Sequence, residues 1–210
     1  MSLKERRLNV LLDLDNTIIN SLESKEIKNI SPDIQSQFLY KDMDNFFRVF
    51  GRPHLDAFLD YLFDNYNVGV YTAAESSYAL FIVNNFILTK PGRKLNLFMY
   101  RYHVTLGEQR YGEGRIKDLR LLWEFMKLYN YYPCNTILID DLSDVKKTNP
   151  KNVIAIPSFD MVKESGSFNS SALKDTALLG VMDKLDVLNS IYKQSYSNLN
   201  PSYRYTPILN

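Results

Sequence analysis

The feature that most constrains the fold is a set of short, nearly continuous apolar runs separated by amphipathic stretches. The runs lie at residues 8–14, 68–71, 136–139 and 153–156. Runs of this length are typical of strands buried on both faces. Stretches with apolar residues at helical spacing lie at residues 53–66, 76–86, 117–129 and 172–192. Strands that alternate with helices predict an α/β fold, with a parallel sheet and helices on both faces.

Two segments fall outside this alternation. Residues 20–51 are polar and aromatic, and we expect them to form an insert above the carboxyl edge of the sheet, where ligands of open α/β sheets bind. We therefore predict one domain over residues 1–193 and a tail over residues 194–210. The tail is expected to pack on folded surface, of its own domain or of a self-associated neighbour. Its anchors would be Tyr196, Tyr203 and Tyr205.

Composition narrows the chemistry that such a chain could perform. The 210 residues carry a formal net charge of +1 and include one cysteine, Cys134, and two histidines, His54 and His103. A near-neutral chain has no overall field to attract nucleic acid, and no apolar run approaches the ~18 residues that span a membrane. One cysteine excludes an internal disulfide, so we expect an intracellular setting, cytoplasmic or nuclear. We expect Cys134 to be inert and both histidines to be structural, which leaves carboxylates, hydroxyls, lysine and an oxygen-preferring cation to do any chemistry.

The strongest local signal is the motif Asp-Leu-Asp-Asn-Thr at residues 13–17, at the end of the first predicted strand. Residues two apart on an extended chain point to the same side, so Asp13 and Asp15 are expected to lie near one another. Adjacent carboxylates repel each other, and a divalent cation that prefers oxygen ligands would compensate. One carboxylate could then attack an electrophile while the other transfers protons. The alternative is an ordinary turn, in which Asp and Asn are common.

Polar side chains also follow the second and third predicted strands. Thr72 and Ala73 follow the second and offer a hydroxyl group and backbone amides that can hold phosphate oxygens. Asp140 and Asp141 follow the third and offer oxygen ligands for a metal. Lys117 opens a predicted helix, where a cation is unfavourable for the helix dipole, and this position suggests an external anion. The carboxyl ends of parallel strands share one edge of the sheet, so these residues together indicate a phosphate-handling site.

In this order the motifs resemble those of the haloacid dehalogenase superfamily of phosphotransferases. The closer resemblance is to its Fcp and small-CTD-phosphatase (NLI-interacting-factor-like) branch, which acts on the C-terminal domain (CTD) of RNA polymerase II. Besides residues 13–17, the segments that carry it are Arg-Pro-x-x-Asp-x-Phe-Leu at 52–59, Tyr-Thr-Ala-Ala at 71–74, Tyr-Ala at 78–79, Lys-Asp-Leu at 117–119, Asn-Pro-Lys-Asn at 149–152 and Ile-Pro-Ser-Phe at 156–159. The resemblance implies a haloacid-dehalogenase-like Rossmannoid sheet with a small insert in place of a large cap.

The resemblance also implies catalytic roles for the first motif. Asp13 aligns with the nucleophile that becomes an aspartyl phosphate, and Asp15 aligns with the general acid and base. The Asp13 carboxylate and the Asp15 backbone carbonyl are implied ligands of magnesium, and Thr17 helps to orient the loop and bind phosphate. Asn16 stands where the branch usually has Glu.

Further roles are implied for the other strand ends. Thr72 and Ala73 align with residues that bind the phosphoryl group, and Lys117 aligns with the lysine that neutralises nucleophile and phosphate. Asp140 aligns with a magnesium ligand, and Asp141 with the acidic or amide residue beside it. The segment after this acid pair departs from the Ser-Pro that is common in the branch.

The function so implied is a magnesium-dependent phosphoserine or phosphothreonine protein phosphatase, acting on a CTD-like phosphopeptide. Two alternatives stay open: a phosphatase for small molecules or nucleic-acid ends, and a non-catalytic binding module of this fold. The large caps of metabolite enzymes exceed the insert available here, and a binding module has no need of a proton-transfer carboxylate such as Asp15.

The insert also carries the aromatic residues Phe38, Tyr40, Phe46 and Phe47. We expect them close to the rim of the active site, where aromatic faces can hold a proline ring of an extended peptide. The alternative is that they only anchor the insert to the sheet.

Overall fold

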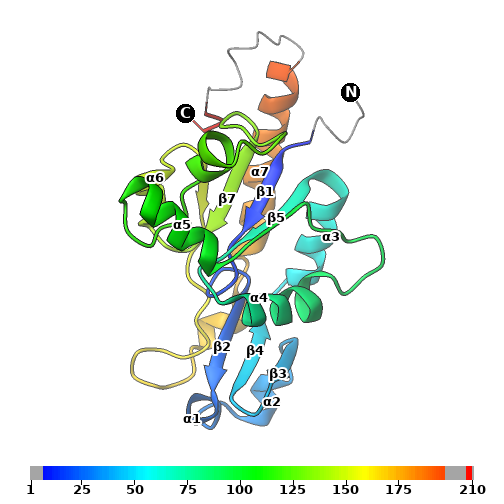
Figure 1. Ribbon diagram of the computed structural model, residues 1–210. Coiled ribbons are helices and arrows are strands. Elements are labelled where there is room, and N and C mark those ends of the chain that lie inside the picture. Colours follow the sequence, from blue (N-terminus) through cyan, green and yellow to red (C-terminus); the bar gives the residue numbers. More distant parts are fainter. Residues whose placement is uncertain (1–6, 197–206, 210) are drawn as a thin grey trace.

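The computed structural model describes residues 7–196 and 207–209 of the chain. Figure 1 shows two parts, a larger one with a central sheet and helices, and a smaller one formed by the insert beyond one end of that sheet. None of the helices in these described residues is long and apolar enough to span a membrane.

The central sheet has five parallel strands. They are β1 (Asn9–Leu12), β5 (Asn67–Tyr71), β6 (Leu97–Met99), β7 (Thr136–Asp140) and β8 (Val153–Ala155), arranged in the order β6-β5-β1-β7-β8. Every residue of the central strand β1 is buried, with Val10 and Leu12 in one hydrophobic cluster and Leu11 in another. The predicted α/β class with a parallel sheet is therefore confirmed.

Helices cover both faces of this sheet. On one face lie α3 (Leu55–Asn65), α4 (Ser76–Ile82) with the π-helical turn Val83–Ile87 that continues it, and α7 (Ala177–Tyr196). On the other lie α5 (Arg101–Tyr111), the π-helical turn Leu121–Phe125 and α6 (Val145–Thr148). The periodicity of residues 53–66 predicted α3 because its buried positions, such as Phe58 and Leu62, recur at helical spacing.

The insert is a small antiparallel sheet with short helices. Its strands are β2 (Ile19–Glu23), β3 (Tyr40–Met43) and β4 (Phe47–Gly51), in the order β2-β4-β3, and its helices are α1 (Ser24–Ile27) and α2 (Pro32–Gln35). Its apolar side packs against Phe159 and Met161, which follow β8, and against Ala172 in the 3-10 turn Ser170–Lys174. The insert therefore shares a core with a segment that lies more than a hundred residues later.

The prediction of one amphipathic helix over residues 117–129 is wrong. Lys117 lies in irregular chain, and the π-helical turn described above is the regular part of this stretch. The Asn149 side chain holds this irregular stretch, because it donates to the Lys117 carbonyl at 2.6 Å and accepts the Leu119 N–H group at 2.8 Å. Lys127 adopts a positive φ of 49° and ends the turn.

The tail prediction falls mainly on residues outside the described ranges. Tyr203, Tyr205 and the side chain of Tyr196 are among them. Within the described residues, Ile208 is buried in the hydrophobic cluster that also holds α7, and the Leu209 N–H group bonds the Lys151 carbonyl at 3.1 Å.

Candidate active site

Asp13 stands directly beyond the central strand, at the carboxyl edge of the sheet. Its N–H group bonds the Ile139 carbonyl of β7 at 3.0 Å, which continues the parallel pairing by one step. The carboxylate is buried, with Oδ1 2.7 Å from Lys117 Nζ and Oδ2 3.2 Å from the Thr17 hydroxyl oxygen. Both oxygens of Asp13 are therefore held by neighbouring side chains in a fixed orientation.

Lys117 lies between two carboxylates. Its ammonium group is 2.8 Å from Asp140 Oδ2 as well as 2.7 Å from Asp13, and its side chain is 3% exposed. Burial alone lowers the pKa of Lys117, but attraction to both carboxylates outweighs this effect and raises the pKa above its ordinary value. Lys117 is thus a fixed positive charge, and the Asn149 bonds described above hold its backbone in place.

Asp15 is half-buried and receives one hydrogen bond from a tyrosine. The hydroxyl group of Tyr78 on α4 donates to Asp15 Oδ1 at 2.5 Å, and it also contacts the Ser21 hydroxyl group on β2. Burial raises the pKa of Asp15 and repulsion from Asp13 adds to the rise, while the Tyr78 bond opposes it. A raised pKa suits a carboxyl group that transfers protons.

Asp13, Asp140 and Asp141 form a cluster that fits a divalent cation. One carboxylate oxygen of each lies within 4.8 Å of the others. Burial raises the pKa of Asp141 and raises that of Asp140 to about 6, with repulsion from Asp13 contributing to both. One lysine therefore does not balance the negative charge that is gathered here. Carboxylate oxygens are the ligands that magnesium prefers, so the donor set suits this ion.

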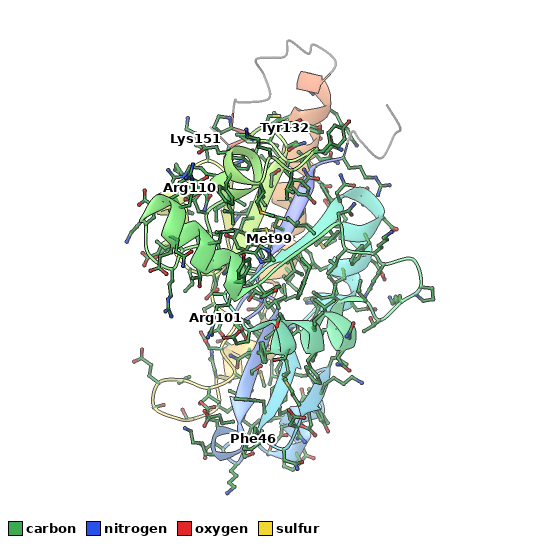
Figure 2. All side chains as sticks on the ribbon, viewed as in Figure 1. Phe46, Met99, Arg101, Arg110, Tyr132 and Lys151 are labelled. Atoms are coloured by element: carbon green, nitrogen blue, oxygen red, sulfur yellow. The ribbon has the colours of Figure 1, made fainter. Side chains whose placement is uncertain are left out.

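Thr72, Ala73 and Arg101 line the same pocket, which has a volume of about 350 Å³. Thr72 is buried at the end of β5, where its hydroxyl group accepts the Ala74 N–H group at 3.1 Å. Arg101 starts α5 beyond the end of β6, and its side chain donates to the Ala73 carbonyl at 3.1 Å and pairs with Glu75 at 2.8 Å. Figure 2 shows Arg101 between the central sheet and the insert. The pocket thus joins the acidic cluster to a second cationic side chain at its rim.

The loop that follows Asp13 is fixed by Arg52. The Arg52 side chain is fully buried and donates to the carbonyls of Thr17 and Pro157 at 2.8 Å each. It also forms two bonds to Asp175, which in turn accepts the Ala177 N–H group at the start of α7. This one guanidinium group ties the loop after Asp13 to the segment after β8 and to the last helix.

Asn16 turns the same loop. It adopts a positive φ of 58°, a conformation that Asn tolerates better than most residues. Its side chain donates to Asp160 at 2.8 Å, and its carbonyl accepts the Phe159 N–H group at 2.7 Å. Asn16, which stands where the branch usually has Glu, is therefore a turn-forming residue that lines the pocket.

All eight residues that the sequence singled out lie at this edge of the sheet. The pocket contains Asp13, Asp15, Thr72, Ala73, Lys117 and Asp141 in its wall, and Thr17 and Asp140 bond directly to these residues. No role was predicted for Tyr78, Arg52 or Asn149, although all three lie in the segments that carry the resemblance. Arg101 was not predicted either, because the short strand β6 before it has no clear signal in the sequence.

The insert aromatics were expected close to the rim of the active site, and none of the four is among the residues that line the pocket. Phe38 is 7% exposed and packs edge-on against Phe50, so it anchors the insert. Phe46 is 72% exposed, and Figure 2 shows it at the end of the insert farthest from Arg101. His54 and His103 are likewise absent from the pocket lining, and Cys134 is buried.

Residues 8–195 match the family described as NLI interacting factor-like phosphatase. The chain is 36% identical over 170 residues to the putative CTD phosphatase-like protein 355R of Invertebrate iridescent virus 6, a match that covers 79% of this chain and 93% of the relative. It is 27% identical over 188 residues to CTD nuclear envelope phosphatase 1B of Danio rerio, covering 87% of this chain and 67% of that protein.

A solved structure of Fcp1, an essential RNA polymerase II CTD phosphatase, has the same fold. It aligns with a TM-score of 0.56 and 19% sequence identity over 98% of this chain. This chain spans 58% of that structure. At this level of identity the likeness concerns the fold alone.

Proposed function

The chain belongs to the NLI interacting factor-like phosphatase family, and from this premise we propose that it hydrolyses phosphoserine or phosphothreonine in proteins through an aspartyl-phosphate intermediate. The observation that carries the proposal is the arrangement of Asp13, Asp15 and Lys117 around one pocket at the sheet edge. It combines a held carboxylate, a second carboxyl group with a raised pKa and a fixed positive charge.

In the first step, Asp13 attacks the phosphorus atom of the substrate. A bond forms between a carboxylate oxygen of Asp13 and phosphorus as the bond from phosphorus to the seryl or threonyl oxygen breaks. The electron pair of the broken bond goes to the leaving oxygen, which takes a proton from Asp15. Lys117, 2.7 Å from Asp13, and the Thr72 hydroxyl group stabilise the charge on the transferred group.

In the second step, water attacks the phosphorus atom of the aspartyl phosphate. Asp15, now a carboxylate, takes a proton from that water molecule as the bond between phosphorus and the Asp13 oxygen breaks. Phosphate and the free Asp13 carboxylate are the products, and Asp15 is protonated again for the next cycle. The same carboxyl group therefore serves as acid and then as base.

We propose that magnesium is the cation held by Asp13, Asp140 and Asp141, with the Asp15 backbone carbonyl as a further ligand. The fit rests on the excess of carboxylates over the single ammonium group of Lys117. When bound, the ion supplies positive charge that offsets the charge of the phosphoryl group. Lys117 supplies the same kind of stabilisation from the protein side.

The proposed substrate is a polypeptide, such as a CTD-like phosphopeptide, and not a small metabolite. The pocket opens at the surface, where Leu142 and Arg101 are exposed, and none of the described residues of the insert lines it. An open rim admits a side chain that projects from an extended chain. Two of the relatives are named as CTD phosphatase-like or CTD phosphatases, which agrees with this substrate class.

The deciding experiment compares kcat/KM for phosphoserine peptides, phosphorylated sugars and nucleotides, each with magnesium and with a chelator. We expect the peptides to be the best substrates and activity to require magnesium. A metabolite cleaved about a hundredfold better than every peptide, a difference of about 2.7 kcal/mol in transition-state binding, would contradict the protein-phosphatase assignment. Trapping the phosphoenzyme with hydroxylamine, which converts an acyl phosphate to a hydroxamate, tests the intermediate.

A further inference from the structure

Tyr78 connects three parts of the molecule through one hydroxyl group. Its ring packs against the hydrophobic cluster on the face of the sheet covered by α3 and α7. Its hydroxyl group reaches Asp15 in the catalytic loop at 2.5 Å and Ser21 on the insert strand β2. Each hydroxyl group has a single proton, so both contacts are satisfied when Ser21 donates to Tyr78 and Tyr78 donates to the Asp15 carboxylate.

Tyr78 is the side chain that bonds the Asp15 carboxyl group among the described residues. Asp13, by comparison, is held at both oxygens, by Lys117 and by Thr17. Without Tyr78, the Asp15 carboxyl group could rotate about its terminal torsion, which has a broad energy well. Its orientation therefore depends on a residue that lies outside the acidic cluster.

We propose that Tyr78 is a positioning residue that orients Asp15 for proton transfer, and that Ser21 orients the Tyr78 hydroxyl group. This inference rests on the proposed function. With Oδ1 bonded to Tyr78, Oδ2 is the oxygen that gives its proton to the leaving oxygen and later takes one from the attacking water. Through Ser21, strand β2 of the insert is connected to the acid–base group.

A positioned acid matters most when the leaving group is basic. A seryl oxygen must be protonated as its bond to phosphorus breaks, whereas para-nitrophenolate is stable enough to leave without a proton. The ratio kcat/KM reports the steps up to formation of the phosphoenzyme, so hydrolysis of the intermediate does not affect the comparison. Loss of positioning should therefore slow the peptide reaction and spare the aryl phosphate.

The test measures kcat/KM of Tyr78→Phe, Ser21→Ala and Tyr66→Phe on a phosphoserine peptide and on para-nitrophenyl phosphate. Tyr66 is the matched control, because its buried hydroxyl group bonds Tyr61 at 2.8 Å, away from the pocket. We expect Tyr78→Phe to lose about tenfold or more on the peptide and less than about threefold on the aryl phosphate, since general acid–base catalysis contributes about 10²–10⁴-fold. Ser21→Ala should show the same selectivity with a smaller loss, and Tyr66→Phe should match the wild type on both substrates.

Equal losses on both substrates in Tyr78→Phe would mean a general disturbance of the site and would overturn the inference. Wild-type values on both substrates would overturn it as well. The conservative Ser21→Ala change removes one hydroxyl group from a paired strand, so it tests the connection even if Tyr78→Phe folds poorly; wild-type values for it would refute the role of Ser21. A wild-type protein that is inactive on both substrates would instead contradict the proposed function itself.

Discussion

Single residues set the charge balance of the pocket. Asp13 and Asp140 share the ammonium group of Lys117, and Asp15 and Asp141 lie close enough to Asp13 for their pKa values to be raised by repulsion as well as by burial. Each carboxylate therefore affects the others. A substitution that neutralises one of them should relieve charge repulsion and so favour the folded state, while it lowers the catalytic rate.

Asp13→Asn is expected to abolish hydrolysis and to preserve the fold. The amide keeps the shape of the side chain but cannot form an acyl phosphate, so turnover should fall below about one percent of wild type. The free energy of unfolding should stay the same or rise, because the change relieves repulsion with Asp15 and Asp140 while Lys117 keeps its bond to Asp140. Steady-state kinetics and thermal unfolding measure both effects, and several percent of residual turnover with an intact fold would refute the nucleophile assignment.

The positions of the site residues could be predicted from the sequence, because each follows a buried strand and parallel strands end at one edge. This reasoning located Asp13, Thr72 and Asp140. It could not identify Arg52 or Tyr78 as supporting residues, since their partners Asp175 and Ser21 come from distant segments. The chemical roles of all these residues stay predictions.

At the scale of elements, buried strands were the easiest to predict. β1, β5, β7 and β8 are continuous apolar runs, and their bounds agree with the prediction to within two residues. The strands of the insert were not predicted; β3, for example, exposes most of its residues and has no apolar alternation. Helix α5 was missed for a similar reason, since it buries few side chains.

The bonds of Arg52 predict that this residue contributes strongly to the stability of the fold. Arg52→Lys keeps the charge but cannot reach the carbonyls of Thr17 and Pro157 and both oxygens of Asp175 at once. We expect it to lower the free energy of unfolding by about 3 kcal/mol, measured by urea denaturation. Arg48→Lys is the control and should cost less than Arg52→Lys, because Arg48 is partly exposed and pairs with the exposed Asp42, with Gln35 as its further hydrogen-bond partner. Equal losses in the two variants would contradict the role given to Arg52.

His103, at the start of α5, is expected to make the free energy of unfolding depend on pH. Burial lowers the pKa of His103, whose Nδ1 accepts the Tyr100 N–H group at 3.2 Å. The unfolded chain therefore binds a proton at His103 more readily than the folded chain, so the contribution of His103 to the free energy of unfolding falls as the pH drops through the ordinary histidine pKa of about 6.5. Asp140, whose pKa is raised to about 6, contributes in the opposite direction, so the test is the difference between the wild type and His103→Gln. In urea unfolding between pH 7.5 and 5.5, the free energy of unfolding of the wild type should fall relative to that of His103→Gln, by less than about 1.4 kcal/mol per pH unit. An unchanged slope would show that His103 does not contribute.

At the scale of the whole molecule, the pocket joins segments that are distant in the sequence. The loops after β1, β5 and β7 each supply residues, as do Lys117 and the start of α5. The core shared by the insert and residues 159–172 could not be predicted, because nothing in either stretch indicates its partner. A ligand of the pocket therefore contacts several distant segments at once, and its binding site exists only in the folded chain.

Magnesium should consequently stabilise the entire fold. An ion that binds the folded state alone raises the free energy of unfolding by about 2.7 kcal/mol at a concentration about 100 times its Kd. We expect this rise in urea unfolding of the wild type, its reversal by a chelator and its loss in Asp140→Asn, which removes one carboxylate of the cluster.

Asp144→Asn is the control, because Asp144 is exposed and pairs with Lys147 outside the cluster. Potassium chloride at matched ionic strength separates specific binding from screening. An equal rise in Asp140→Asn and the wild type, or an equal rise with potassium chloride, would contradict the metal site independently of any activity measurement.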